Sequence, residues 1–208
     1  MALLELQGVS KTFHHRAQPP LRAVQDVSIA VEPGETLALV GESGSGKTTL
    51  ARIALCLVEP DAGDVRLAGR SLLRATRREL RAARLRLQPV FQDSSSAFNP
   101  RRTVRAILRQ VLERAGVARP GDASLCTLLE RVELRPAPGF LDRYPNELSG
   151  GQRQRLAIAR AIAPTPQVII ADEPLSGADV SIRAQLLNLL LDLQAASGVA
   201  YLLITHDI

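Results

Sequence analysis

Gly41-Glu42-Ser43-Gly44-Ser45-Gly46-Lys47-Thr48 is the stretch that decides the fold of this chain. It follows the apolar run 37–40 and precedes a segment with helical spacing, so it is G-x-x-x-x-G-K-[ST] between a strand and a helix. Glycines allow the backbone to wrap closely around an anion, and the amides of the loop and first helical turn, through Thr49, then point at phosphates. The pattern predicts a P-loop that binds a nucleoside triphosphate, with Lys47 reaching the β- and γ-phosphates and Thr48 binding Mg²⁺.

The length and composition favour one ordinary folded domain. At 208 residues and 46% apolar content, the chain has room for an α/β body with an inserted subdomain. The first residues lack the pattern of a secretory signal, and the apolar runs are too short to span a membrane. Cys56 and Cys126 form no C-x-x-C pair, which fits a reducing cytosol.

The net charge of +5 comes almost entirely from arginine, which is dense between residues 66 and 109. Nucleic-acid binding is one interpretation, but the segment lacks aromatic residues on which bases could stack. A solvated helix face, or a face turned to an anionic membrane surface, explains the arginines better. We therefore expect no nucleic-acid partner.

The order of elements predicts an α/β fold of the P-loop NTPase type, with paired N-terminal strands and a mainly parallel sheet. Residues 101–146 carry helical spacing interrupted by Gly and Pro, which indicates an inserted helical subdomain within a single domain, 1–208. The predicted strands are 3–9, 23–31, 36–40, 64–67, 85–91, 168–171 and 199–204, and the other predicted helices are 47–58, 71–83, 149–163 and 181–196.

Two acids follow the apolar strand 168–171, which we expect to be central and parallel. An apolar strand that ends in Asp downstream of a P-loop is typical of the carboxylate that holds Mg²⁺ through water. Asp172 therefore becomes a candidate metal ligand, and Glu173 a candidate to polarise the attacking water.

A second anion site is indicated at residues 148–152, where Ser149, Gly150, Gly151 and Gln152 open a helix that carries Arg153 and Arg155. Ser149 is also a plausible helix N-cap, which would be a structural role alone. Two phosphate cradles with one P-loop suggest that the second cradle serves a nucleotide bound to another chain.

In this order and wording, the motifs resemble those of the nucleotide-binding domain of ABC transporters. Residues 41–48 match Walker A, Phe91-Gln92 the Q-loop, 148–152 the signature motif, and 168–172 with Glu173 Walker B and the catalytic glutamate. Residues 176–179 match the D-loop and His206 the H-loop, while Phe13 matches the aromatic residue that stacks on adenine.

The resemblance implies ATP and Mg²⁺ as cofactors and assigns roles to particular residues. Gln92 would touch Mg²⁺ and sense a membrane subunit, and His206 would contact the γ-phosphate. Glu173, His206 and Lys47 would be the catalytic residues. Thr48, Gln92 and Asp172 would bind the metal.

The residues in and around these motifs resemble those of ATPases of oligopeptide, dipeptide and nickel importers, notably in 98–101, 143–149, 170–174 and 179–181. The resemblance then implies a second ATPase subunit, identical or different, bound head to tail. Permease subunits and, indirectly, a solute-binding protein would complete the complex. The chain would lie peripherally at the cytoplasmic face of the cell's inner membrane.

Two departures from the family pattern stand out. The D-loop reads Ser176-Gly177-Ala178-Asp179 instead of Ser-Ala-Leu-Asp, and the chain stops at Ile208, where relatives continue. We expect a C-terminally truncated domain whose last strand, 199–204, lies at an exposed sheet edge. The alternatives are a soluble ABC-type ATPase that acts on nucleic acid or the ribosome, and a truncated protein that binds ATP without turnover.

Overall fold

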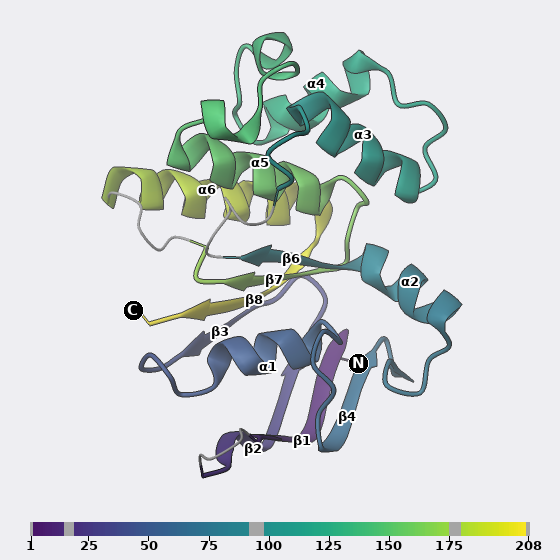
Figure 1. The fold of residues 1–208 in the computed structure, drawn as a ribbon, viewed down its shortest axis with the longest axis vertical. Coiled ribbons are helices and arrows are strands. Elements are labelled where there is room, and N and C mark those ends of the chain that lie inside the picture. The colour runs from purple at the N-terminus through teal and green to yellow at the C-terminus, as the bar shows by residue number, and fades with distance from the viewer. Residues whose placement is uncertain (1, 15–18, 92–97, 175–179, 207–208) are drawn as a thin grey trace. The chain divides into compact units, whose positions relative to one another are not determined.

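The computed structural model describes residues 2–14, 19–91, 98–174 and 180–206 (Figure 1). The chain divides into two compact units. The first comprises Met1–Pro89, Gln167–Glu173 and Val199–Ile208, and the second comprises Val90–Pro166 and Pro174–Gly198. No helix in the described ranges is both long enough and apolar enough to cross a membrane.

An antiparallel sheet forms one layer of the first unit. Its strand order is β2-β1-β4-β5, and its strands are β1 (Leu4–Phe13), β2 (Leu21–Val31), β4 (Ala62–Leu67) and β5 (Arg70–Ser71). β1 pairs with β2 from Leu4 opposite Val31 to Phe13 opposite Leu21, so the predicted pairing of the N-terminal strands is confirmed. Both strands are longer than predicted because pairing continues beyond the apolar alternation.

The second sheet has the order β3-β8-β7-β6, with β3 (Thr36–Val40), β6 (Leu87–Phe91), β7 (Val168–Asp172) and β8 (Ala200–Thr205). β8 runs parallel to both β3 and β7. The prediction that the last strand is a sheet edge is therefore wrong. β8 inserts between two strands that come earlier in the sequence, and sequence order alone does not reveal this insertion.

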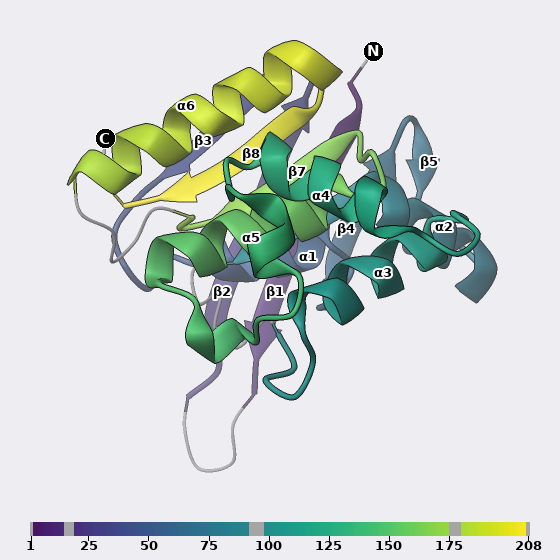
Figure 2. The same ribbon diagram turned by 90° about the horizontal axis from the view of Figure 1, so that it is seen from above.

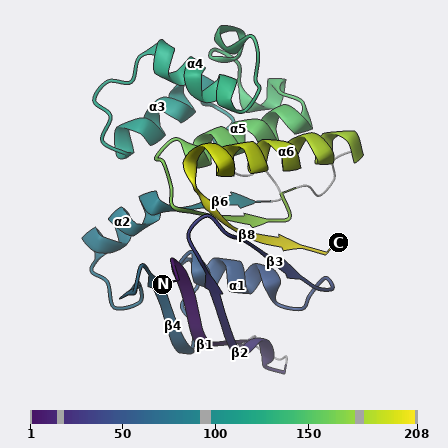
Figure 3. The same cartoon turned by 180° about the vertical axis from the view of Figure 1, so that it is seen from behind.

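Every residue of β7 is buried, which agrees with the apolar sequence of 168–171 and the predicted position of this strand inside a parallel sheet. Helix α1 (Lys47–Ala54) contacts strands of both sheets and lies between them in Figures 1 and 3. Its Ile53 and Ala54 are fully buried. The helix ends earlier than the predicted residue 58 because Cys56 takes a positive φ of 51°.

Helix α2 (Arg77–Arg86) begins six residues later than predicted. Ser71 belongs to β5, and the Thr76 side chain accepts a hydrogen bond from the Glu79 amide while Glu79 accepts one from the Thr76 amide. This capping box starts the helix at a defined point, since it satisfies two backbone donors at once. The apolar spacing in 71–76 belongs instead to the turn that precedes the helix.

Apart from Val90 and Phe91, which end β6, the regular structure described in the second unit is helical. It contains α3 (Val104–Arg114), α4 (Asp122–Arg131), the 3-10 turns η1 (Ala137–Phe140) and η2 (Pro145–Glu147), α5 (Gly150–Ile162) and α6 (Val180–Ser197). Helices α3, α4 and α5 contact one another, as Figure 2 shows. Leu108, Leu125, Leu129 and Leu156 are fully buried.

Candidate active site

The P-loop connects the carboxyl end of β3 to the first turn of α1, as the sequence predicts. Gly46 is the N-cap of α1 with φ 94°, and the cap makes no side-chain hydrogen bond. The first amides of a helix have no partner within the helix, and here no capping side chain takes them. The unpaired amides at the start of α1 are therefore free to bind an anion, and the helix dipole favours negative charge at this end.

Lys47 is a buried cation whose ammonium group is directed back into its own loop. Its Nζ donates to the carbonyl oxygens of Gly41 and Glu42, both at 2.6 Å, and lies 3.4 Å from Ser45 Oγ. Only 9% of the Lys47 residue surface is exposed. Lys47 is therefore largely withdrawn from solvent.

Thr48 and Asp172 come from distant parts of the sequence and meet in the first unit. The Thr48 hydroxyl donates to Asp172 Oδ1 at 3.3 Å, across 124 positions of sequence. Hard oxygen ligands of this kind are what Mg²⁺ prefers, and such sites use one or two carboxylates together with substrate phosphates. No cluster of three or more His, Cys, Asp or Glu side chains suited to a metal is present in the described residues.

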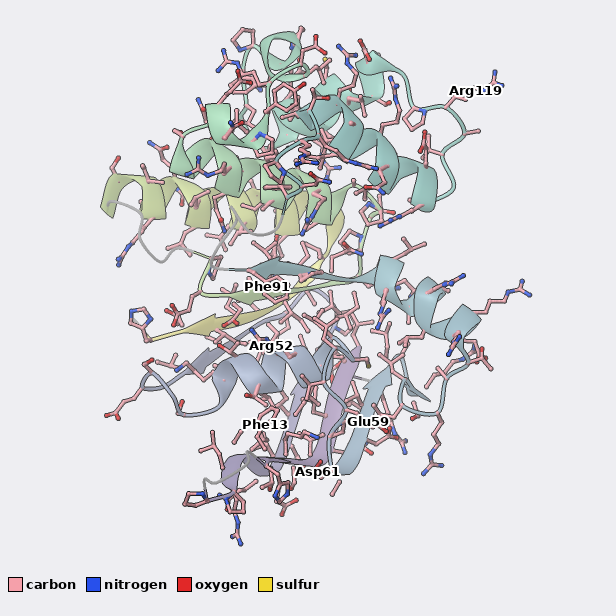
Figure 4. The ribbon with its side chains drawn as sticks, in the orientation of Figure 1. Phe13, Arg52, Glu59, Asp61, Phe91 and Arg119 are labelled. Carbon is pink, nitrogen blue, oxygen red and sulfur yellow. The ribbon has the colours of Figure 1, made fainter. Side chains whose placement is uncertain are left out.

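The carboxyl group of Asp172 lies at the buried end of β7, with 6% of the residue exposed. Burial raises the pKa of Asp172, and the negative charge of Glu173 raises it further. The Thr48 hydroxyl and the charges of Arg52 and Lys47 act in the opposite direction without outweighing burial. Ionised Asp172 is thus held in a site that favours a cation beside it. Arg52, labelled on α1 in Figure 4, is a contributor that the sequence reasoning missed.

Glu173 and His206 form a hydrogen-bonded pair. His206 Nδ1 lies 2.9 Å from Glu173 Oε1, and because a carboxylate can only accept, Nδ1 carries the proton. The histidine side chain is about half exposed. Glu173 has a positive φ of 49°, and its amide donates to Ile204 O at 2.8 Å, which anchors the residue against β8.

Phe13 ends β1, and its neighbourhood contains two residues that the sequence analysis did not select. Lys11 Nζ lies 5.8 Å from the centroid of the Phe13 ring. Asp61 accepts hydrogen bonds from Lys11 Nζ and from the Thr12 amide, both at 2.7 Å. Phe13 and Asp61 lie at the same end of the β1–β4 pair (Figure 4). The available signal was that Lys11 and Lys47 are the only lysines of the chain.

In the second unit, Ser149 is the N-cap of α5 within a capping box. Its hydroxyl accepts from the Gln152 amide at 3.3 Å, and Gln152 Oε1 accepts from the Ser149 amide at 3.0 Å. The structural role considered for Ser149 is therefore present. Gly151 lies near Ile182, whereas a Cβ at Gly150 would meet no atom within 4 Å and the backbone there has no positive φ. The described structure thus offers no steric reason for glycine at 150.

The two arginines expected to line this second cradle have structural partners instead. Arg153 donates to the Leu148 carbonyl oxygen, and Arg155 donates to the carbonyl oxygen of Val132 and to the carboxylate of Glu133. Both side chains are thereby held to residues of their own unit. Any anion contact at this helix start depends on backbone and small side chains more than on these guanidinium groups.

Gln92, and the D-loop residues 176–179, lie outside the described residues. The described site residues of the first unit are Phe13, Gly41, Glu42, Ser43, Gly44, Ser45, Gly46, Lys47, Thr48, Thr49, Asp172, Glu173 and His206. Those of the second unit are Ser149, Gly150, Gly151 and Gln152.

Asp172→Asn is expected to raise the free energy of unfolding of the nucleotide-free protein by about 1 kcal/mol at neutral pH. Because the folded-state pKa of Asp172 is raised, wild type loses stability as pH rises through that pKa, whereas the variant does not. The stability gap should therefore widen from acid to neutral pH in chemical denaturation. Asp192→Asn, which removes an exposed acid of α6, is the control. A variant less stable than wild type at neutral pH would contradict the expectation.

A P-loop between a parallel strand and a helix, with an acid pair at the end of β7, the next strand but one in the same sheet, defines a P-loop nucleotide-binding protein. Residues 24–176 match the family described as ABC transporter. The chain belongs to the ABC transporter family, and the predicted fold, a mainly parallel sheet with an N-terminal antiparallel sheet, is confirmed.

Among relatives, the chain is 46% identical to "Probable peptide ABC transporter ATP-binding protein y4tS" of Sinorhizobium fredii, over 100% of this chain and 60% of that protein. It is 44% identical to "Glutathione import ATP-binding protein GsiA" of Salmonella choleraesuis, over 99% of this chain and 34% of that protein. The chain thus spans about a third to three fifths of these two relatives.

Among solved structures, the chain resembles the ATP-binding cassette MJ0796 in a dimeric post-hydrolysis state bound to ADP and Pi. The TM-score is 0.86 at 30% identity, covering 98% of this chain and 88% of that one. A second dimeric structure of the same cassette gives a TM-score of 0.84 at 31% identity.

Proposed function

We propose that this chain binds and hydrolyses ATP in an ABC importer and thereby drives solute uptake. The single observation that carries the proposal is the hydrogen bond between Glu173 and His206, 2.9 Å long, one residue beyond the Asp172 that meets Thr48. A carboxylate oriented by an imidazole, next to a P-loop, is suited to activate a water for attack on a phosphate.

The roles of the residues follow from their positions in the first unit. The backbone of 41–49 cradles the phosphates, and Lys47 releases its loop carbonyls to bind the β- and γ-phosphates. Thr48 and Asp172 would hold Mg²⁺, which when bound would neutralise charge on the phosphates. Glu173 accepts a proton from the attacking water, and His206 orients Glu173 and contacts the γ-phosphate through Nε2. Phe13 stacks on adenine.

The second part of the proposal is a composite site in a head-to-tail dimer. Ser149, Gly150, Gly151 and Gln152 would bind the nucleotide held by the P-loop of another subunit. Gly150 supports this role, since a side chain there would meet nothing within this chain, so a close approach from outside explains the glycine. The related cassette MJ0796 is dimeric in two solved structures. Gln92 would sense Mg²⁺ and transmit closure to a membrane subunit.

The cargo and assembly rest on the relatives, whose names specify peptide transport and glutathione import. We propose peptides or a related small solute as cargo, with nickel as a further candidate. The partners are a second ATPase subunit, permease subunits and, indirectly, a solute-binding protein, at the cytoplasmic face of the membrane. We further propose that residues 1–208 belong to one ABC ATPase domain with a helical subdomain at about 101–146.

Lys47→Ala tests the proposal directly. In the full-length protein, steady-state ATP hydrolysis in Mg²⁺ should fall by about 100-fold or more, because a charge that stabilises the transferring phosphoryl group is lost. Arg22→Ala, an exposed residue of β2, serves as the control.

Equal hydrolysis by wild type and Lys47→Ala would favour a protein that binds ATP without turnover. Stimulation of hydrolysis by nucleic acid or ribosomes, and not by permease-containing vesicles, would replace the importer with the other ABC class.

A further inference from the structure

A hollow of about 240 Å³ lies in the first unit between helix α2, strand β5 and the turn that joins them. Figures 1 and 2 show α2 close to the end of the antiparallel sheet. Binding pockets for drug-sized molecules run from about 300 to 1,000 Å³, so this hollow suits a smaller ligand. None of the residues placed in the ATP site lines it.

Three arginines line the hollow from three different segments: Arg70 from β5, Arg74 from the turn and Arg86 from the end of α2. Among the described residues, no carboxylate lies within salt-bridge distance of any of the three. Arg86 Nε donates to Gln167 Oε1 at 2.7 Å, a neutral partner that orients the group without reducing its charge. The three arginines therefore line one hollow without a salt bridge to any described carboxylate, and only the charge of Glu79 acts on one of them, Arg70.

The one acid of the lining, Glu79, is already engaged elsewhere. Its Oε2 accepts from the Thr76 amide at 2.8 Å and from the Thr76 hydroxyl at 2.7 Å. These hydrogen bonds, with a smaller contribution from the charge of Arg70, hold the pKa of Glu79 below its ordinary value, so it is a carboxylate at neutral pH. With three arginines and one carboxylate, the lining has a formal charge of +2.

The inner wall of the hollow is apolar. Leu67, Leu72 and Ala83 contribute to it, and all three are buried. A bare inorganic ion would interact with the arginines only, and the apolar wall would remain exposed to water. A phosphate ester of a small alcohol satisfies both, since guanidinium groups bind phosphate oxygens in forked pairs and the carbon skeleton covers the apolar wall.

We propose that this hollow is a binding site for a small phosphate ester, of the phosphoglycerol kind. Such a group occurs free in solution and as the headgroup of anionic phospholipids, and both sources present the same chemistry to Arg70, Arg74 and Arg86. The exposed arginines 77, 78, 81 and 84 of α2 surround the site with positive potential, which raises the local concentration of anions.

The test compares two charge-matched double variants of the full-length protein. Arg70→Gln with Arg74→Gln removes two charges from the hollow, and Arg77→Gln with Arg78→Gln removes two exposed charges of α2 that do not line it. One arm titrates glycerol 3-phosphate in excess ADP, which keeps the P-loop from competing. The other arm measures sedimentation with phosphatidylcholine vesicles, with and without phosphatidylglycerol.

The hollow variant should bind the phosphoglycerol group at least about tenfold more weakly than the α2 variant, because it loses charged hydrogen bonds as well as general attraction. Such a difference with glycerol 3-phosphate identifies a soluble ligand, and a difference with vesicles alone identifies a lipid. Equal losses in the two variants, or no binding in either arm, would overturn the proposal. Unchanged circular dichroism spectra and rates of ATP hydrolysis equal to that of wild type verify that both variants are folded.

Discussion

Glu173→Gln is expected to lower ATP turnover by at least about 100-fold while ATP binding is retained. The amide cannot take a proton from the attacking water, but it keeps the size of the side chain and can still accept from His206 Nδ1. The backbone φ of 49° at this position is equally strained for both residues, so the fold should not change. Single-turnover hydrolysis and equilibrium binding of labelled ATP separate chemistry from affinity.

In the presence of ATP, the Glu173→Gln variant should also accumulate as a dimer, because hydrolysis would no longer open the closed state. Light scattering with and without ATP measures this dimer. Glu130→Gln, an exposed residue of α4, supplies the control for loss of one negative charge. If Glu173→Gln shows neither ATP binding nor ATP-dependent dimers, the proposed mechanism does not apply to this chain.

Gly46→Ala is expected to destabilise the protein by about 3 kcal/mol or more and to abolish ATP binding. A Cβ at this position would lie 2.0 Å from the carbonyl oxygen of Ala23 and 3.1 Å from its carbonyl carbon. Both are backbone atoms of β2, so no side-chain rotation relieves the clash. The φ of 94° adds backbone strain that only glycine avoids. Urea denaturation of the nucleotide-free protein measures the loss.

Gly44→Ala is the matched control for the clash. Gly44 also has a positive φ, 84°, but an added Cβ would meet nothing within 4 Å. The Gly44→Ala variant should therefore be destabilised only by the backbone strain of alanine at this φ, by about 1 kcal/mol. The difference between the two variants isolates the contact with Ala23. Equal destabilisation by the two changes would show that the close contact between Gly46 and Ala23 of β2 does not contribute to the loss of stability.

Local signals predicted the elements that carry the site. The P-loop was recognisable because glycine spacing, an apolar run and a helical segment follow one another without gaps. Strand β7 was recognisable because residues 168–171 are four consecutive apolar residues without polar alternation. Helix α2 was misplaced at its start, although the Thr76–Glu79 capping pattern was available in the sequence to correct it.

The side-chain contacts on which the proposed chemistry depends could not be predicted from the sequence pattern alone. Asp172 and Glu173 were selected because they end β7, yet their partners Thr48 and His206 are separated from them by 124 and 33 positions. Arg153 and Arg155 were expected beside an anion, but Arg153 binds Leu148, and Arg155 binds Glu133 and Gln185. Lys11 and Asp61 were not selected because their pairing depends on the register between β1 and the start of β4.

The sequence by itself determined the P-loop, the acidic end of β7 and the family, because these are encoded in contiguous residues whose backbone conformation is set locally. The tertiary structure alone decided that β8 inserts between β3 and β7, which brings the Glu173 amide to Ile204 and the His206 ring to the Glu173 carboxylate. It also decided that Gly46 faces the backbone of Ala23. The physical reason is that side-chain pairs distant in sequence form only where sheet register and helix packing bring their backbones together.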